Sequence, residues 1–583
     1  MCNGSVTAKG PARIADRRGK GIVPIGIESF ADVMARHVYV DKTRVVVDLV
    51  DRGGVTLFCR PRRFGKSLLL RMLQCYFEAP VDGYVEDFGP LFEGLAIMDV
   101  DDEYYTDERD AHPVIYLSLN VCGGDTWKHM RESIAQMVGD EYRRHAYLLE
   151  SSALLRMDRE YCEHILRGEG SLSELESSLS RLAKMLHSHH KQQPVILIDE
   201  YDKIVTEGFI HGYREQATDF LKRWLTGALK STVDLRLAVL TGVQRVSKES
   251  IFSDLNNFTV DTALDHQYSE AFGFTQSEVE ELASYLGHGS TVVQLKQWYD
   301  GYDFGGEAVY NPWSVLNYLR MGCVAQPYWT NTSSNDVVRR LIARAGEQTN
   351  AQLTSLAEGG CVSTPLDLSI VFGQIDSDTH AIWSQLYLAG YLTTHDVAEP
   401  NNTGLERSLV VPNLEVRQLF SRELQERAVS AAGSRHSLAN LHTALVTGNG
   451  DSVTYELENA LLNSVSYYDL RDEASCHMWL LALMYGMDGY RFPRSNREVG
   501  RGRPDIVCEP DSLHETELPA IVAEVKFCRD AQEDELTKIA AGSLTGQALA
   551  KRYAHGLAGN GAIFLSVAFD NHKHVAVART AYA

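Results

Sequence analysis

Short apolar runs alternate with amphipathic stretches through the first half of the chain. Four of these runs predict buried strands, at residues 55–59, 112–120, 195–200 and 235–241. A capping box of Ser171 and Glu174 predicts the start of a helix between the second and third runs. Its leucines recur with a helical period: Leu172, Leu175, Leu179, Leu182 and Leu186. Buried strands that alternate with helices imply a mainly parallel sheet covered on both faces.

The second half is helical at first and then returns to apolar strands. A second capping box, formed by Thr275 and Glu278, opens a helical region that extends to about residue 430. Its aromatic residues are predicted to pack in a core and not to form a base-stacking platform: Trp298, Tyr299, Tyr302, Trp313 and Trp329. Further strands are predicted after Asp505 and at residues 521–527.

A basic loop with a Gly-Lys-Ser sequence joins the first predicted strand to an apolar helical run. Strand, loop and helix come in the order of a nucleotide-binding P-loop, in which backbone N–H groups bind phosphates. Lys66 would neutralise the β- and γ-phosphates, and Ser67 would ligate Mg²⁺. The first position of the loop holds Arg60 where glycine is usual, and Pro61 follows with its fixed φ. The residues predicted to contact the nucleotide are Arg62, Arg63, Phe64, Gly65, Lys66 and Ser67. The alternative is a basic surface turn between a buried strand and a helix.

Two later strand ends carry polar groups that suit the same chemistry. The third predicted strand ends in Asp199 and Glu200. In P-loop enzymes the first acid holds the Mg²⁺ shell, and the second orients and deprotonates water. The fourth strand ends at Thr241, followed by Gln244 and Arg245, where P-loop ATPases place a γ-phosphate sensor. Apolar strands that end in acids or in polar turns are also common without such a role.

Composition narrows the classes of protein that remain. A length of 583 residues, with 44% hydrophobic and 23% charged residues, predicts a globular protein of several domains. A net charge of −22 argues against non-specific coating of nucleic acid, although a local basic groove is compatible with it. Ten cysteines without C-x-x-C pairs predict reduced thiols in a cytoplasm and no zinc site. The sequence contains no run of about 18 apolar residues, so no membrane-spanning helix is predicted. Residues 1–20 are basic and lack an apolar core, which predicts a disordered tail and not a signal peptide.

A second set of chemical groups lies near the C-terminus. Asp505 begins one apolar strand, and Glu524 and Lys526 alternate on the next, so that these two side chains share a face. This layout is typical of PD-(D/E)xK nucleases, in which the two acids bind Mg²⁺ and the lysine orients water or stabilises the phosphate. Glu473 shares a helical face with His477 and would complete the metal site. The alternatives are an E-x-K strand without catalytic function and a structural His477. Nearby arginines would bind phosphates or balance neighbouring acids: Arg494, Arg497, Arg501 and Arg503.

Long segments from about residue 21 onward resemble the AAA-ATPase-like family of bacterial and other microbial proteins. They are VPIGIESF (23–30), YVDKT (39–43), LFCRPRRFGKS (57–67), VILIDEYD (195–202), TGVQRVSKESIFSDLNN (241–257), WYDGY (298–302), YNPWSVLNYL (310–319) and YWTNTSSND (328–336). In that family RPRRFGK[ST] is the normal P-loop, so the resemblance implies that Arg60 is compatible with nucleotide binding. Further matches resemble the nuclease-like domain appended to the family: YYD at 467–469, SNRE at 495–498, the EVK at 524–526, Gln547 and Tyr553.

We therefore predict an α/β protein with four parts. Residues 1–20 are the tail, and residues 21–272 form a P-loop NTPase domain, an αβα sandwich. Residues 273–430 form a helical lid and linker module, and a winged-helix fold is one option for this module. Residues 431–583 form an α/β nuclease-like domain of the PD-(D/E)xK type.

The predicted function is ATP binding and hydrolysis coupled to a Mg²⁺-dependent nuclease-like domain that acts on DNA or RNA. The resemblance associates such a protein with defence or mobile-element conflict. A second hypothesis is a regulatory ATP switch whose C-terminal domain binds nucleic acid or protein without cleaving. A third is an interaction scaffold with a vestigial P-loop. Either Arg245 or a neighbouring subunit of a homo-oligomer would supply an arginine finger.

Overall fold

The structure of the chain is a computed structural model. It describes residues 12–230, 234–245, 258–330, 338, 347–368, 379–395, 406–447, 450–464, 472–495, 503–549 and 557–582. The chain divides into two compact units: unit 1 is Met1–Thr332 with Ser363–Glu415, and unit 2 is Ser333–Val362 with Val416–Ala583. Unit 2 thus takes helix α14 (Glu347–Ala357) from the middle of the chain and begins again inside α16 (Leu414–Ala432), before the predicted boundary at residue 430.

A five-stranded parallel sheet in the order β4-β5-β6-β3-β7 forms the centre of unit 1. Its strands are β3 (Gly54–Cys59), β4 (Val114–Ser118), β5 (Val195–Asp199), β6 (Leu237–Gly242) and β7 (Phe258–Asp261). The four strands predicted from the apolar runs are confirmed, and β7 is an edge strand that the pattern did not indicate. Every residue of β5 is buried, as expected for a strand covered on both faces.

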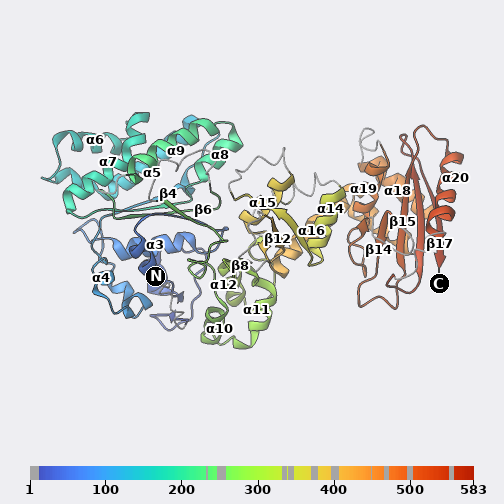
Figure 1. Cartoon of the computed structure of the whole chain (residues 1–583), viewed down its shortest axis with the longest axis horizontal. Helices are drawn as coiled ribbons and strands as arrows, with labels where there is room; N and C mark the ends of the chain where they lie inside the picture. Colours follow the sequence, from blue (N-terminus) through green and yellow to red (C-terminus); the bar gives the residue numbers. More distant parts are fainter. Residues whose placement is uncertain are drawn as a thin grey trace. The chain divides into compact units, whose positions relative to one another are not determined.

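Helices cover both faces of this sheet. Figure 1 shows α5, α7 and α9 on one side and α3 on the other. The helices are α1 (Phe30–Arg36), α2 (Val45–Arg52), α3 (Lys66–Phe77), α4 (Glu103–Thr106), α5 (Trp127–Arg144), α6 (Arg156–Leu166), α7 (Leu172–His190), α8 (Lys203–His211) and α9 (Arg214–Leu229). Four leucines of α7 (Leu175, Leu179, Leu182 and Leu186) and Trp224 of α9 are buried in one core with Leu57 and Ile198 of the sheet, and Leu172 packs against it partly buried. The predicted α/β fold with a parallel central sheet is confirmed.

The predicted capping box at the start of α7 is present. The Ser171 hydroxyl accepts from the Glu174 N–H, and the Glu174 carboxylate accepts from the Ser171 N–H at 2.8 Å. Hydrogen bonds from the Ser171 N–H and from the Ser171 hydroxyl to the Glu174 carboxylate, with a further one from His164, lower the pKa of Glu174 to about 2. Two backbone donors that a helix start leaves without intrahelical partners are therefore satisfied.

Residues 12–20 are ordered, although the sequence predicted a disordered tail at residues 1–20. Within residues 12–20, β1 (Ile14–Ala15) pairs with β2 (Tyr39–Val40) in an antiparallel ladder. The Arg13 guanidinium forms an ion pair with Asp99 at 2.5 Å, and the Tyr285 hydroxyl donates to Asp16 at 3.0 Å. Specific partners far along the chain order this basic stretch, and composition alone does not reveal them. Residues 1–11 lie outside the described part of the chain.

The region after the sheet is helical, as predicted, but it also contains short strands. Its elements are α10 (Gln276–Tyr285), α11 (Val292–Tyr299), β8 (Tyr302–Phe304), β9 (Glu307–Val309), α12 (Pro312–Arg320), β10 (Cys361–Pro365), α15 (Thr379–Ala389), β11 (Thr393–Thr394) and β12 (Glu406–Val410). The predicted capping box of Thr275 opens α10. Tyr299, Tyr302 and Trp329 are buried, as predicted for core aromatics, whereas Trp298 and Trp313 are half-buried.

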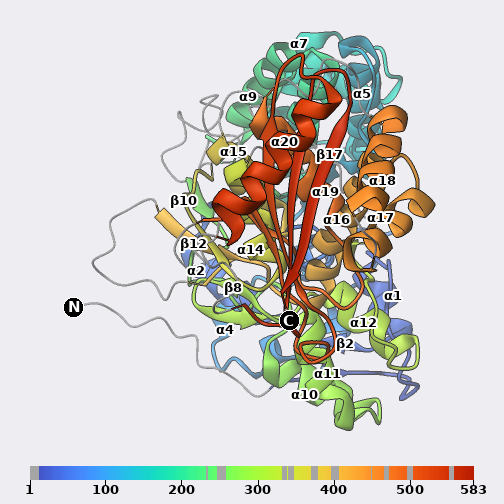
Figure 2. The same cartoon turned by 90° about the vertical axis from the view of Figure 1, so that its right-hand side faces the viewer.

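Unit 2 is built on a second five-stranded sheet, in the order β13-β14-β15-β16-β17. Only β15 and β16 are parallel within it. Figure 2 shows α20 on one side of this sheet and α18 and α19 on the other. The elements are α17 (Arg435–Thr447), α18 (Gly450–Ser464), α19 (Glu473–Leu483), β13 (Arg494–Ser495), β14 (Ile506–Cys508), β15 (Ala520–Phe527), α20 (Glu533–Ser543), the π-helical turn η8 (Leu544–Leu549), β16 (Ala562–Phe569) and β17 (Val575–Tyr582).

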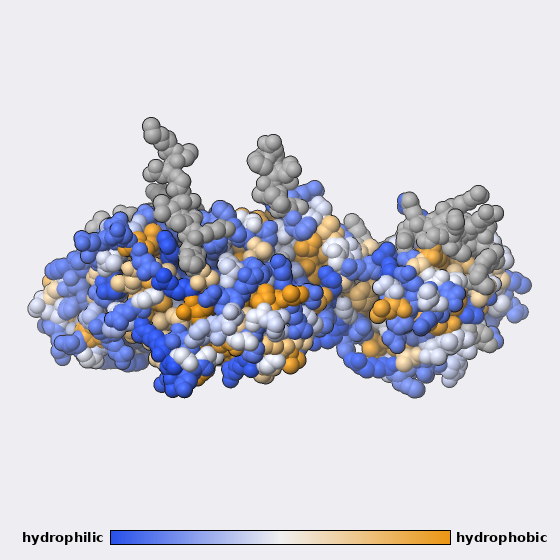
Figure 3. All heavy atoms as spheres, turned by 90° about the horizontal axis from the view of Figure 1, so that it is seen from below, coloured by the Kyte–Doolittle hydropathy of each residue, from blue (hydrophilic) through white to orange (hydrophobic). Residues whose placement is uncertain are grey.

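On the coloured part of the face drawn in Figure 3, small hydrophobic areas lie among hydrophilic ones. Single exposed apolar residues are normal on a folded protein. None of the helices in the described part of the chain combines the length and the apolarity needed to cross a bilayer.

Candidate functional site

The P-loop and both polar strand ends meet at one edge of the unit 1 sheet. Strand β6 lies between β3 and β5, so that Phe58 is opposite Thr241 and Ile198 is opposite Leu240. Because all three strands are parallel, their carboxyl ends emerge together. The loop after β3, the acids after β5 and the turn after β6 are therefore neighbours, at the edge where open α/β sheets bind ligands.

The loop after β3 has the backbone of a phosphate-binding turn. Arg63 and Gly65 adopt left-handed conformations, with φ of 70° and 88°, and α3 begins at Lys66. Such a turn points consecutive backbone N–H groups at one spot, and the start of α3 adds its positive dipole end. Ser67 lies in the first turn of this helix, half-buried.

Lys66 is folded back over its own loop. Its ammonium group is buried and donates to the carbonyl oxygens of Arg60 at 2.9 Å and Pro61 at 2.7 Å. Burial lowers the pKa of Lys66, while the carboxylates of Asp199 and Glu200 act in the opposite direction. The buried ammonium group is therefore solvated by the carbonyl oxygens of its own loop.

Arg60, which occupies the usual glycine position, is part of the protein core and is fully buried. Its guanidinium forms an ion pair with Asp261 of β7 at 2.5 Å and donates to the Asp261 carbonyl at 3.1 Å. The rings of Phe272 and Phe304 lie 5.1 and 5.2 Å from it. Its backbone N–H donates to the Gly242 carbonyl at 3.1 Å. Because φ of Arg60 is not positive, the position does not require glycine, and the side chain is free to tie β3 to β7.

The other loop side chains separate into two groups. Phe64 is buried, with its ring 4.9 Å from Tyr302 and 5.0 Å from Phe304, so only its backbone is left to contact the predicted nucleotide. Arg62 and Arg63 are exposed, and the Arg63 guanidinium lies 4.2 Å from the centre of the Trp313 ring. These arginines therefore line the open side of the loop.

The two acids after β5 have distinct environments. Asp199 is 2% exposed, and its Oδ1 accepts from the Thr241 hydroxyl and from the Glu200 N–H. Glu200 is half-buried and has a left-handed backbone with φ of 51°, a strained conformation for glutamate. Burial and the neighbouring charge of Asp199 raise the pKa of Glu200, while Lys66 and Arg62 oppose that rise. The Thr241 hydroxyl is therefore in contact with Asp199, the predicted metal ligand. The left-handed backbone of Glu200 ends the extended course of β5.

Asp202 is a residue of this site that the sequence pattern did not identify. It is 6% exposed, and its Oδ2 accepts from the backbone N–H groups of Val243 at 3.0 Å and Gln244 at 3.1 Å. It therefore holds the turn after β6 against the segment after β5. Arg245, the predicted phosphate contact, is exposed at the end of that turn. Residues 246–257 of the matching family segment lie outside the described part of the chain.

The donor set at this edge fits a magnesium–nucleotide complex. Mg²⁺ prefers carboxylate and hydroxyl oxygens and usually binds through one or two protein groups together with substrate phosphates. Asp199 and Ser67 offer those two oxygens. The left-handed Gly65 and the start of α3 offer backbone N–H groups to phosphates.

The second predicted site is partly assembled in unit 2. Ile506 of β14 is opposite Ala523 of β15, which places Asp505 beside Glu524 in the same register. The Asp505 Oδ2 accepts from the Val525 N–H at 2.7 Å, and Glu524 is 2% exposed. Two carboxylates thus flank the end of the strand pair.

His477 has a structural position beneath this pair. It is 6% exposed, and its Nε2 lies 3.0 Å from the Asp505 carbonyl oxygen and 3.3 Å from the Ser495 hydroxyl. The imidazole therefore fixes the backbone of Asp505, in agreement with its structural interpretation.

Glu473 does not form the third carboxylate of a group. Its Oε1 forms an ion pair with Lys526 Nζ at 3.0 Å. Within the described ranges, no three His, Cys, Asp or Glu side chains are close enough together to hold a metal ion. The reason is geometric: Glu473 begins α19 and meets the lysine of β15, not the Asp505–Glu524 pair.

Among the predicted phosphate-binding arginines, Arg494 is engaged by Glu358, with an ion pair at 2.8 Å, and Arg503 is exposed. Arg497, Arg501, Tyr553 and the YYD at 467–469 lie outside the described residues, and nothing is described of the side chain of Gln547.

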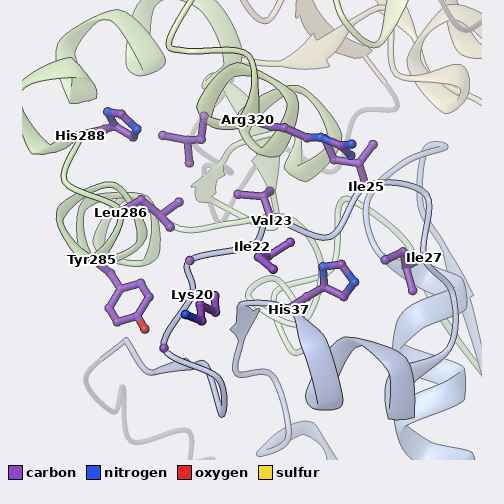
Figure 4. A pocket seen from close by; sticks show the side chains of 13 residues that line it. Lys20, Ile22, Val23, Ile25, Ile27, His37, Tyr285, Leu286, His288 and Arg320 are labelled. Carbon is purple, nitrogen blue, oxygen red and sulfur yellow. The ribbon is translucent and has the colours of Figure 1, made fainter.

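Two cavities lie apart from the P-loop residues. One of about 680 Å³ in unit 1 is lined by residues 19–23, Ile25 and Ile27 together with residues that include His37, Tyr285 and Arg320 (Figure 4). The other, of about 540 Å³ in unit 2, lies between α14 and β13 and includes Glu358 and Arg494. No P-loop residue lines either cavity.

Three known families or proteins are similar to parts of this chain. A protein of Azotobacter chroococcum mcd 1, described as an uncharacterized protein in the vnfD 5′ region, is 29% identical over 405 residues, which cover 69% of each chain. A solved STAND protein (signal transduction ATPase with numerous domains) from Pyrococcus horikoshii, with a tetratricopeptide repeat sensor, is 11% identical with a TM-score of 0.22. The match covers 76% of this chain and 53% of that one, so it spans about half of that protein, and a TM-score this low establishes no shared fold. Residues 24–252 match the model of the AAA-ATPase-like family, described as predicted AAA-ATPase, so this part of the chain is similar to that family.

Proposed function

We propose that unit 1 binds ATP with Mg²⁺ at the P-loop and hydrolyses it. The observation that carries this proposal is the meeting of Lys66, Asp199 and Glu200 at the carboxyl edge of the parallel sheet, with the strand of Thr241 between the two motifs. The family match of residues 24–252 supports the same nucleotide chemistry.

Each residue has a defined task in this proposal. The backbone N–H groups from Gly65 to Ser67 bind the phosphates, and Lys66 exchanges the carbonyls of its own loop for phosphate oxygens. Ser67 and Asp199 would hold Mg²⁺, which neutralises phosphate charge when bound. Glu200 orients water and accepts its proton, and its raised pKa brings it closer to the working pH of a general base. Thr241 and Arg245 would contact the γ-phosphate side.

Replacement of Lys66 by alanine is expected to weaken ATP binding by on the order of 10- to 100-fold, since a charge-assisted contact to phosphate is lost. The measurement is the dissociation constant of a fluorescent ATP analogue with Mg²⁺. The matched control is Lys230→Ala, which removes an exposed lysine at the end of α9. Equal affinities for all three proteins would overturn the assignment of the P-loop and favour the scaffold hypothesis.

We also propose that unit 2 is a Mg²⁺-dependent nuclease-like domain that acts on nucleic acid. The observation in its favour is the adjacent pair Asp505 and Glu524 at the end of the β14–β15 strand pair, with Lys526 two residues further along β15. Two carboxylates suffice for Mg²⁺ when substrate phosphates supply further ligands. Lys526 is held by Glu473 and would change partner to orient water or stabilise the phosphate.

The alternative is a regulatory ATP switch in which unit 2 binds nucleic acid or protein without cleavage. The ion pair of Lys526 with Glu473 favours it, because this lysine is already neutralised by a side chain. In both cases ATP is the ligand of unit 1, and the difference between them lies in the chemistry of unit 2.

Replacement of Lys526 by alanine is expected to reduce Mg²⁺-dependent cleavage by on the order of 100-fold, as for the loss of one stabilising donor in a transition state. Cleavage is measured on supercoiled plasmid, single-stranded DNA and RNA, with ATP present. Lys538→Ala on the exposed side of α20 is the matched control and should cleave as the wild type does. If the wild type and both variants are equally inert on every substrate, the switch hypothesis replaces the nuclease.

A further inference from the structure

Two polypeptide segments at the unit 1 site are joined by a set of hydrogen bonds that the proposed mechanism does not use. One is the segment 199–206 after β5, and the other is the turn 241–245 after β6. We call this set of bonds the staple. The Asp202 carboxylate accepts two of its bonds, from the N–H groups of Val243 and Gln244.

Tyr201 supplies two more bonds of the staple. Its N–H donates to the Thr241 carbonyl at 2.9 Å, and its hydroxyl donates to the Gln244 carbonyl at 2.8 Å. The Gln244 side chain donates to the Thr206 hydroxyl at 3.3 Å, which in turn donates to the Asp202 carbonyl at 2.9 Å. Every residue of the turn from Thr241 to Gln244 is thus bonded to the segment 199–206 or lies beside it.

Close packing reinforces the hydrogen bonds. A Cβ added to Gly242 would come within 2.7 Å of the Tyr201 ring and 2.9 Å of an Asp202 carboxylate oxygen. Glycine is therefore required here by the approach of the staple, not by its backbone angles, since φ of Gly242 is not in the left-handed range. The turn and the segment after β5 are in van der Waals contact with no room between them.

The same turn is tied to the P-loop on its other side. The Arg60 N–H donates to the Gly242 carbonyl at 3.1 Å, and Lys66 caps the Arg60 carbonyl at 2.9 Å. The turn after β6 therefore bridges the P-loop and the segment that carries Glu200. A change in its position would alter the distance between the phosphate-binding loop and the proposed general base.

We infer that Asp202 is a positioning residue for hydrolysis: it holds the turn after β6 so that Glu200, Thr241 and Arg245 keep their places around the γ-phosphate. The inference rests on the proposed ATP hydrolysis. Asp202 is 6% exposed and its carboxylate accepts from two backbone N–H groups of the turn, so its proposed role is to hold the turn and not to contact the phosphate. Its loss disturbs the geometry of the reaction step more than the binding of the nucleotide, because most of the proposed phosphate contacts, including Lys66, lie in the P-loop and α3, and only those of Thr241 and Arg245 lie in the turn.

The test compares Asp202→Ala, Asp202→Asn and Tyr201→Phe in the full-length protein. Alanine removes both bonds of Asp202 and is expected to lower kcat at least about tenfold, with the dissociation constant of an ATP analogue changed less than about threefold. Asparagine keeps an oxygen that accepts from both N–H groups, so it should retain most of kcat. The phenylalanine variant loses only one staple bond and should lie between alanine and the wild type.

A second measurement separates failure of this inference from failure of the proposed function. Hydrogen–deuterium exchange of the Val243 and Gln244 amides should be slow in the wild type and in Asp202→Asn, and fast in Asp202→Ala. If the wild type releases no phosphate but this exchange pattern is found, the proposal of ATP hydrolysis fails. The finding that Asp202 holds the turn after β6 would remain valid.

Two results would overturn the inference. One is equal exchange of these amides, or equal kcat, in the wild type and Asp202→Ala. The other is a parallel loss of nucleotide binding and kcat in Asp202→Ala, which would assign Asp202 to the stability of the P-loop region and not to the reaction geometry.

Discussion

Replacement of Glu200 by glutamine is expected to reduce ATP hydrolysis by on the order of 100-fold while leaving nucleotide binding intact. Glutamine has the shape of glutamate but cannot accept the proton of the attacking water. Glu200 contributes nothing to phosphate binding in the proposed mechanism, because that task falls to the P-loop and Lys66. Removing a negative charge from the site should also leave the triphosphate bound at least as tightly.

The measurement is phosphate release under single-turnover and steady-state conditions, with retention of labelled ATP on the protein after rapid desalting. Glu215→Gln is the matched control, because Glu215 is an exposed glutamate in the first turn of α9, away from the site. A Glu200→Gln protein that turns over ATP at the normal rate would refute the assignment of the general base. A protein that no longer binds ATP would show that Glu200 has a structural role, for which its strained backbone would be the cause.

The motifs of unit 1 were predictable because each is local in sequence. An apolar strand followed by Gly-Lys-Ser, and another followed by two acids, indicate which strand ends carry the candidate functional side chains. The order of the strands is not local: nothing in the sequence pattern shows that the strand of Thr241 lies between the other two. That order is what brings Thr241 against Asp199 and builds the site.

Two residues of the site have environments set by distant partners, which a local sequence pattern does not show. Phe64 belongs to a consecutive basic loop, yet its ring is buried against Tyr302 and Phe304, which lie far along the chain. Asp202 precedes α8 and looks like an ordinary helix cap, but its side chain makes no cap hydrogen bond and binds the turn after β6 instead. The only local sign of this role in the sequence is that Asp202 follows Asp199, the acid at the end of the strand, by three residues.

The site in unit 2 also combines local features that the sequence predicts with a distant contact that it does not. The alternation of Glu524 and Lys526 along β15 and the position of Asp505 before its strand are both local, and the register agrees with them. The partner of Lys526 is not local, because the sequence indicates that Glu473 lies on a helix but not which side chain it will reach. The Glu473 carboxylate is paired with Lys526 in the structure, and its part in a metal site stays a prediction.

Replacement of Arg60 by alanine is expected to destabilise unit 1 by about 3–5 kcal/mol, the largest stability effect we expect at this site. The guanidinium and the Asp261 carboxylate are 0% and 4% exposed, so removal of one charge leaves the other buried without its partner. The contacts of the guanidinium with the Phe272 and Phe304 rings are lost as well. In scanning calorimetry of the full chain, the transition of unit 1 should fall by roughly 5–10 °C.

The control for this effect is Arg62→Ala, which removes an exposed arginine from the same loop and should change the stability by less than about 0.5 kcal/mol in the absence of nucleotide. A second comparison is the double variant Arg60→Met with Asp261→Asn. It removes both charges and should recover more than half of the loss, because no charge is then left buried without a partner. Equal destabilisation of the single and double variants would show that packing, and not the buried charge, dominates.

The pH dependence of the same variant identifies the charge that is left behind. Burial raises the pKa of Asp261 to about 6 even with Arg60 beside it, against 3.8 for the free side chain. A carboxyl whose pKa is raised in the folded state stabilises that state fully below pH of about 4 and loses this contribution as the pH rises through the folded pKa. Without Arg60 the pKa of Asp261 should rise further, so the loss continues above pH 6. Arg60→Ala is therefore expected to lie closer to the wild type at pH 5 than at pH 8, and an equal gap at both values would contradict the buried-charge explanation.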